Sequence, residues 1–385
     1  MTDYEEQLKN YLKNLPSPNI AIIGLTGVGK SSLINGIFGT NMATTGSALP
    51  TTTKYYPYPL KLDEKERLFK KTLLNVYDSP GYEPGLGDDF MKETFNFLED
   101  KSRLGKEEQI HIVWYIISAS AARLTQADKD IIDKINENNI PAIIVLSKCD
   151  IAKQEQKDEI KNAIAAAKFS KVYEIVEVIA DPLTLPNGEK ICKPSGMKEL
   201  VNLTTDKLPD KIFKDAFIAA QTVDLKPKKE LAWQYISEAS WTCFAVGALP
   251  IPLTAPTSAV AALGYMYNRI IIVYGHTNLK LLQAISGITL GGMFMLFVDG
   301  VIDLFSSMLG ISILTGGAAA TFTAISGMAF TNTCERLAIG ELTDTVNDIQ
   351  PKLREIFKEE FEKLSTIRIS TRNDLDKVGR DFIDN

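Results

Sequence analysis

The chain has 385 residues, 45% of them hydrophobic and 23% charged, which is enough for two folded domains with separate cores. The formal net charge of −6 argues against a general nucleic-acid-binding protein, because such proteins normally present a basic face, so we expect no nucleic-acid partner. Four cysteines without a CxxC pair and only two histidines argue against a structural zinc site and indicate free thiols in a reducing compartment.

Residues 1–18 are polar and predict a short N-terminal helix over 4–14, which the prolines at 16 and 18 end. This segment lacks the apolar run of a secretory signal. We therefore expect a cytoplasmic protein, either free or associated with or inserted in the cytosolic face of a membrane.

The segment 19–208 alternates short apolar runs with helical patterns. Apolar runs bounded by turn signals are typical of buried strands, and buried strands that alternate with helices predict a parallel sheet covered on both faces. We therefore expect an α/β domain of three layers. The apolar runs are NIAIIG at 19–24, LLNVYD at 73–78, IHIVWYIIS at 110–118, PAIIVLS at 141–147 and YEIVEVIA at 173–180.

The strand signals stop near residue 209, and long apolar helical stretches follow. Residues 239–268 carry no charge, and the window 281–334 carries only Asp299 and Asp303. We expect an all-α, strongly apolar domain over 209–345, followed by a charged amphipathic C-terminal helix over 346–385.

Two interpretations of the apolar windows stay open. Each window exceeds the roughly 20 residues that cross a bilayer, and Gly287 with Gly291 forms a GxxxG pattern that permits close helix packing, which favours membrane insertion or association. Asp299 and Asp303 favour the other interpretation, core helices that bury one another, because each aspartate would cost about 2.5–3.5 kcal/mol at the centre of a bilayer.

The stretch GLTGVGKS at 24–31 matches G-x-x-x-x-G-K-[ST] between a predicted strand and a predicted helix. Its glycines let backbone N–H groups converge on phosphate oxygens, and the helix adds the positive end of its dipole. We expect Lys30 to bridge the β- and γ-phosphates and Ser31 to ligate Mg²⁺. The predicted nucleotide-binding residues of this loop are Gly24, Thr26, Gly27, Val28, Gly29, Lys30, Ser31 and Ser32.

A D-x-x-G motif, Asp78 to Gly81, ends the second strong strand. Its carboxylate can hold the Mg²⁺ shell, while the Gly81 N–H can face the γ-phosphate and respond to its loss. We expect GTP to order the segments 40–59 and 81–95 and hydrolysis to release them.

A threonine is needed in the loop between residues 39 and 59 to complete the Mg²⁺ shell. Thr51, Thr52 and Thr53 are all candidates, and we favour Thr52. The predicted metal ligands are thus Ser31, Thr52 and Asp78, and the predicted catalytic residues are Lys30, Thr52 and Gly81.

The sequence S-K-C-D at 147–150 closes the next buried strand and predicts the base. Asp150 can accept two hydrogen bonds from the N1–H and 2-amino groups of guanine, a donor pair that adenine lacks. The stem of Lys148 can lie along the base plane. Ser147 stands where this motif usually has asparagine, and its hydroxyl can still brace the phosphate loop.

Four motifs in this order, over roughly half of the chain, resemble an Era/TrmE-type GTPase. The resemblance implies a P-loop NTPase domain over 19–208 and implies that Ala180 offers its backbone N–H to guanine O6. The segment 215–276, with its PIP and R-x-x-x-x-YG cues, resembles the YcjF-like helical domain of unknown function. A G domain followed by an apolar helical domain is also similar, more distantly, to the immunity-related and dynamin-like GTPases.

The sequence therefore predicts a Mg²⁺-dependent enzyme that hydrolyses GTP to GDP and phosphate. Its switch loops would control the helical domain at a lipid surface or in a homodimer or homo-oligomer formed through the G domain. Tyr82 stands where small signalling GTPases place glutamine, so we expect slow intrinsic hydrolysis that self-association or a partner stimulates.

Three alternatives stay open at this point. The first is a GTP-loaded scaffold with negligible turnover and a soluble helical bundle. The second is an ATP-using P-loop enzyme such as a kinase, which requires the S-K-C-D match to be accidental. The third, a channel or transporter regulated by the G domain, applies only if the helical half spans a membrane.

Overall fold

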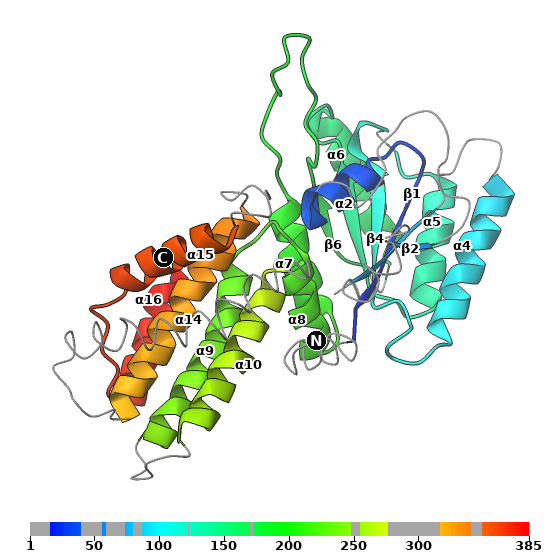
Figure 1. The fold of residues 1–385 in the computed structure, drawn as a ribbon. Helices are drawn as coiled ribbons and strands as arrows, with labels where there is room; N and C mark the ends of the chain where they lie inside the picture. Colours follow the sequence, from blue (N-terminus) through cyan, green and yellow to red (C-terminus); the bar gives the residue numbers. More distant parts are fainter. Residues whose placement is uncertain are drawn as a thin grey trace. The chain divides into compact units, whose positions relative to one another are not determined.

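A computed structural model describes residues 16–39, 56–58, 74–79, 87–121, 123–169, 172–247, 255–275, 316–339 and 349–384. The described residues divide into two compact units, which meet in the sequence at Asp224 and Leu225. The first unit is α/β, and the described part of the second is helical (Figure 1). The predicted helix over 4–14 lies outside the described residues, as do Thr52, Gly81, Gly287, Gly291, Asp299 and Asp303.

Six strands of the first unit form one sheet in the order β2-β3-β1-β4-β5-β6. All of its neighbouring pairs are parallel except β2 with β3, which is antiparallel. The predicted α/β domain with a parallel sheet is confirmed. The strands are β1 (Asn19–Gly24), β2 (Tyr56–Tyr58), β3 (Asn75–Asp78), β4 (Ile112–Ser118), β5 (Ala142–Ser147) and β6 (Val172–Glu177).

The edge strand β2 lies in the segment that the sequence predicts as a loop, so the loop prediction is wrong for these three residues. A run of only three residues centred on Pro57 carries no recognisable strand pattern. Proline has no backbone N–H to donate to a neighbouring strand, so it is tolerated in an edge strand such as β2 but not in the middle of a sheet.

Helices cover both faces of this sheet (Figure 1). One core contains buried residues of α2, α7 and α8, and the other contains buried residues of α4, α5 and α6. Consecutive side chains of β4 pack into opposite cores, Trp114 into the first and Tyr115 into the second. The helices are α2 (Lys30–Phe38), α4 (Gly87–Ser102), the 3₁₀ turn η1 (Ala119–Ala121), α5 (Gln126–Glu137), α6 (Gln154–Ala167), α7 (Met197–Lys207) and α8 (Lys211–Ala220).

The helix α8 extends the first unit beyond the predicted boundary at residue 208. Phe213 and Phe217 are buried in the same core as Trp114, and the ring centroids of Phe217 and Trp114 lie 6.4 Å apart. The chain then turns at Gln221, whose side-chain oxygen accepts hydrogen bonds from the N–H groups of the residues two and three positions on. We therefore place the boundary at Asp224.

A buried histidine closes the amino-terminal edge of the sheet. His111 Nδ1 accepts the backbone N–H of Asn19 at 2.8 Å, and its Nε2 lies 2.8 Å from the carbonyl oxygen of Lys106. Both contacts are satisfied only by the neutral ring with its proton on Nε2. Burial lowers the pKa of His111 below its ordinary value of 6.5, because the cation would lose solvation and would point an N–H at the N–H of Asn19.

This histidine predicts a dependence of stability on pH. Because the pKa is lower in the folded state, the stabilisation is present above pH 6.5 and is lost as the pH falls through the folded-state value, by at most about 1.4 kcal/mol per pH unit. Urea unfolding at several pH values between 5 and 8 measures this slope. We expect His111→Gln to reduce the slope, and equal slopes in both proteins would contradict the assignment.

The second unit is a group of helices around α14. The 23 residues of α14 are buried along most of its length, and α14 packs against α9, α10 and α15. Several buried hydroxyls donate hydrogen bonds to backbone carbonyls of the preceding helical turn. The Thr331 hydroxyl, for example, donates to the Gly327 carbonyl at 2.8 Å. The helices are α9 (Lys226–Gly247), α10 (Ala255–Val273), α14 (Gly316–Ala338), α15 (Ile349–Lys363) and α16 (Arg372–Asp384).

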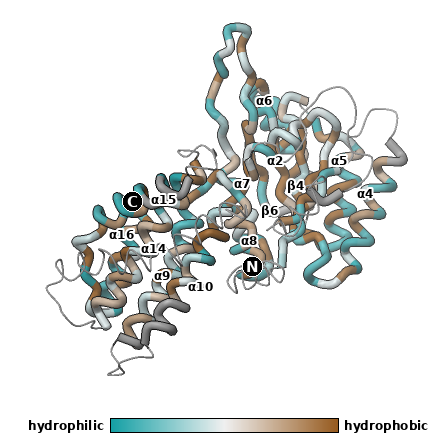
Figure 2. Tube along the Cα trace, in the orientation of Figure 1, coloured by the Kyte–Doolittle hydropathy of each residue, from teal (hydrophilic) through white to brown (hydrophobic). Residues whose placement is uncertain are grey.

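The apolar windows can be compared with this unit only in part. Among the described helices, none combines the length and hydropathy that crossing a bilayer requires. The part of the second window that lies in α14 is buried within the unit, and Figure 2 shows hydrophilic as well as hydrophobic residues along these helices. Of the prediction for residues 209–345, the part that is confirmed is that a helical region follows the sheet domain.

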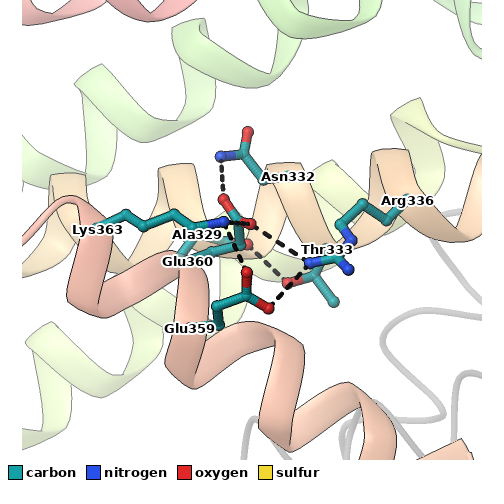
Figure 3. Close-up of polar contacts among 7 residues, drawn as sticks. All are labelled: Ala329, Asn332, Thr333, Arg336, Glu359, Glu360 and Lys363. Atoms are coloured by element: carbon teal, nitrogen blue, oxygen red, sulfur yellow. Dashed lines mark hydrogen bonds and ion pairs between the residues drawn. The ribbon is translucent and has the colours of Figure 1, made fainter.

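A polar network joins α14 to α15 (Figure 3). The buried carboxylate of Glu360 accepts hydrogen bonds from Asn332 at 2.9 Å and from Lys363 at 3.0 Å, while Arg336 lies 3.3 Å from the neighbouring Glu359. All the drawn charges have partners within the network, so we interpret it as a link between the two helices.

The C-terminal segment contains two helices where the sequence predicts one. The interruption includes Ile369. Its backbone N–H donates to Thr321 Oγ1 of α14 at 2.9 Å instead of to a carbonyl of the preceding turn. The helix α16 then begins after Thr371, whose hydroxyl accepts the N–H of Asp374 while the Asp374 carboxylate accepts the N–H of Thr371.

Candidate nucleotide-binding site

The candidate site lies at the carboxyl ends of the parallel strands in the first unit. The strand β1 has β3 on one side and β4 on the other, so the chain runs in opposite directions across the sheet from this point. In open α/β sheets, ligands bind at such a switch point, beyond the carboxyl ends of the strands. The loop 25–29 follows β1 directly at that position.

Glycine permits the path of this loop. Gly29 has φ 98°, a left-handed conformation that disfavours side chains, and a Cβ at Gly24 would lie 2.5 Å from the Ile116 carbonyl oxygen. The helix α2 then begins with no side-chain cap and no acidic residue in its first turn. Its first N–H groups and the positive end of its dipole are therefore available for an anion.

Lys30 lies inside the loop. Its side chain is only 8% exposed, and its ammonium donates hydrogen bonds to the carbonyl oxygens of Gly24 at 2.9 Å and Leu25 at 3.1 Å. Burial lowers the pKa of Lys30, and the nearby carboxylate of Asp78 opposes that shift. A buried ammonium that donates to neutral carbonyl oxygens is placed to gain strongly from an incoming phosphate.

Two of the three predicted metal ligands lie within the described residues. Asp78 ends β3, is 4% exposed and pairs in register with Ile22 of β1, one strand from the loop. Ser31 lies in the first turn of α2 and is half-buried. A carboxylate and a hydroxyl are hard oxygen donors of the kind that Mg²⁺ prefers, so these residues fit the ion. The described residues contain no cluster of three His, Cys, Asp or Glu side chains able to hold a metal alone.

Ser147, at the end of β5, is bonded to the phosphate loop. Its buried hydroxyl donates to the Val28 carbonyl oxygen at 2.6 Å and lies 3.3 Å from the Ile117 carbonyl oxygen. This contact joins the end of the fifth strand to the loop after the first strand, as we expect for a serine that braces the loop. The remaining loop residues, Thr26 and Gly27, are exposed, and Ser32 is half-buried.

Asp150 lies on the turn that follows β5. Lys148, with φ 55°, starts this turn, and its side chain is exposed. The Asp150 carboxylate is half-exposed, and its Oδ2 accepts the backbone N–H of Leu183 at 2.9 Å. The sequence did not predict a role for Leu183, and a backbone contact leaves no signal in residue type.

Ala180 lies shortly after β6, and its side chain packs against the core that α2 also joins. The structure thus brings the phosphate loop, Asp78, Ser147 and Ala180 to the same end of one sheet. The contributions of these residues to binding and catalysis stay predictions.

The chain is similar to known GTPases in its first half. The family described as 50S ribosome-binding GTPase matches residues 19–148. The Probable GTP-binding protein EngB of a Wolbachia strain from Brugia malayi is 33% identical over 153 residues, which span 39% of this chain and 72% of that protein. GTPase Era of Caldicellulosiruptor saccharolyticus is 27% identical over 218 residues, which span 53% of this chain and 63% of Era.

Among solved structures, Era in complex with MgGDPNP and nucleotides of 16S ribosomal RNA matches 59% of this chain and 68% of its own, at 20% identity and a TM-score of 0.35. A TM-score this low carries no argument. The match spans less than two thirds of the first Era relative, so the functions of the whole relatives do not transfer directly.

Proposed function

Since this chain belongs to the Era/Der/EngB-like family of GTPases, we propose that it binds GTP with Mg²⁺ at this site and hydrolyses it to GDP and phosphate. One observation carries the proposal: the 2.6 Å hydrogen bond from Ser147 to Val28. It couples the strand that ends in the base-reading motif to the loop that would hold the phosphates. A triphosphate and its base then occupy two parts of a single site.

The proposed roles follow the chemistry of each group. The uncapped start of α2 and the Lys30 ammonium would hold the β- and γ-phosphates, whose negative charge, like that of Asp78, compensates for the burial of the ammonium. Ser31 and Asp78, with Thr52, would hold Mg²⁺, which neutralises charge that develops on the phosphate oxygens. Asp150 would read guanine, and the Gly81 N–H would face the γ-phosphate.

We propose slow intrinsic turnover for this enzyme. The P-loop offers Leu25 and the exposed Thr26, neither of which is a base that orients water, and Tyr82 follows the D-x-x-G motif. Stimulation would then come from a second copy through the G domain or from a partner, in line with a switch that acts on the helical unit. Three expectations stay predictions: that the switch acts at a lipid surface, that the protein is cytoplasmic, and that it has no nucleic-acid partner.

Turnover against protein concentration tests this proposal. We expect phosphate release from GTP to require Mg²⁺ and to rise more than in proportion to enzyme concentration. A high rate per molecule that does not depend on concentration would contradict slow intrinsic turnover. Tight GTP binding with no phosphate release at any concentration would favour the GTP-loaded scaffold.

A further inference from the structure

A folded arm, defined here as residues 181–195, connects β6 to α7 and extends past α6 in Figure 1. Its base is closed by the pair Ile179 and Ser195, whose backbones exchange two hydrogen bonds of 3.0 Å. A further backbone bond of 3.0 Å runs from the Ile191 N–H to the Leu183 carbonyl. The arm is therefore a hairpin with its own hydrogen bonds.

The sequence LPNGE at 185–189 explains why the arm turns where it does. The Gly188 N–H donates to the Leu185 carbonyl at 2.8 Å, and the Leu185 N–H donates to the Glu189 carbonyl at 2.7 Å. Gly188 has φ 85°, which glycine adopts without strain, and proline presets the first central position of the turn. The fixed turn holds the segment that contains Leu183 opposite the returning segment.

The arm contacts the candidate base site at one point. The Leu183 N–H donates to Asp150 Oδ2 at 2.9 Å, whereas the Leu183 side chain is 51% exposed. The contact thus comes from the backbone of the arm and not from the leucine side chain. Among the described residues, Leu183 is the one whose N–H forms a hydrogen bond with the Asp150 carboxylate.

We propose that the arm orients the Asp150 carboxylate for guanine and is therefore a positioning element for base specificity. The inference rests on the proposed function. A carboxylate offers about four lone-pair sites, so an N–H on Oδ2 leaves room for the two donors of guanine. Those two donors are read together only if both oxygens face them, and the arm fixes the plane of the carboxylate before the base arrives.

The test compares three variants of the full chain in titrations with GDP and inosine diphosphate, which lacks the 2-amino group. Leu183→Pro removes the donor to Asp150. Leu183→Ala keeps this donor and removes the exposed side chain. Leu185→Pro removes an N–H that bonds only within the arm.

We expect Leu183→Pro to weaken GDP binding by about tenfold and to reduce the preference for GDP over inosine diphosphate, as loss of preorganisation requires. Leu183→Ala keeps the donor, so this variant should keep the preference of the unmodified chain, and so should Leu185→Pro. An unchanged preference in Leu183→Pro would overturn the positioning role. Equal weakening of both nucleotides in both proline variants would also overturn it, because it would indicate damage to the arm as a whole.

The outcome for the unmodified chain separates this inference from the proposed function. If the unmodified chain binds neither nucleotide, or binds both equally, the guanine assignment fails. If it prefers GDP and Leu183→Pro keeps the same preference, only the role of the arm fails.

Discussion

Replacing Asp150 with asparagine should reverse the base preference, from GDP to xanthosine diphosphate. In the proposed site, the Asp150 carboxylate would accept hydrogen bonds from the N1–H and 2-amino groups of guanine, whereas the asparagine NH₂ would oppose the 2-amino donor. Xanthine carries a carbonyl oxygen at that position, so it would accept the new donor. Hydrogen bonds to a charged group contribute about 1.5–3 kcal/mol each, and two of them correspond to a loss of about 10²- to 10⁴-fold in GDP affinity.

Equilibrium titration with fluorescent GDP and with competing xanthosine diphosphate measures this change. Asp130→Asn is the matched control, because Asp130 is an exposed aspartate of α5 whose carboxylate accepts a hydrogen bond from Gln126 at 2.7 Å, outside the arm. We expect this control to bind GDP as the unmodified chain does. If Asp150→Asn retained full GDP affinity, the base-reading role would be wrong.

Replacing Lys30 with methionine should abolish measurable GTP turnover. The ammonium is buried and would donate charge-assisted hydrogen bonds to the β- and γ-phosphates, so its loss should slow hydrolysis by about 10³-fold and weaken GTP binding by about 100-fold. Folding should suffer little, because burial already disfavours this charge and the methionine keeps the apolar stem.

Phosphate release from GTP and urea unfolding, both on the same preparation, check the two halves of this expectation. Lys129→Met, on α5, is the control for loss of one lysine, and its turnover should match the unmodified chain. Substantial turnover by Lys30→Met would show that the phosphates bind elsewhere. A large loss of folding stability would show that Lys30 is mainly a structural residue.

The sheet and the phosphate loop could be predicted from the sequence because their signals are local. The glycine, lysine and serine spacing at 24–31 is typical of a phosphate loop, and five of the six strands lie within or overlap apolar runs of the sequence. The role of Ser147 was predicted from the place of S-K-C-D in the order of motifs, because the Val28 carbonyl that its hydroxyl contacts lies far away in the sequence.

Other features depend on contacts that residue type does not encode. The role of Leu183 is carried by a backbone N–H, and only the LPNGE turn signalled that a hairpin was present. The edge strand β2 is too short to show alternation. The helix α14 is buried along most of its length, and its uncharged stretch suits a central helix of a bundle as well as a membrane helix. Its threonine hydroxyls bond to their own helix, which hides their polarity from any pattern of hydropathy.

Displacement of a fluorescent GDP analogue from the full chain, in Mg²⁺, by unlabelled GDP and by ADP tests the central claim most directly. We predict that GDP displaces the probe and that ADP needs an at least 100-fold higher concentration for the same displacement. The reason is that adenine lacks the pair of donors that guanine offers to the Asp150 carboxylate. Displacement by ADP at the same concentration as GDP, or at a lower one, would contradict a guanine site.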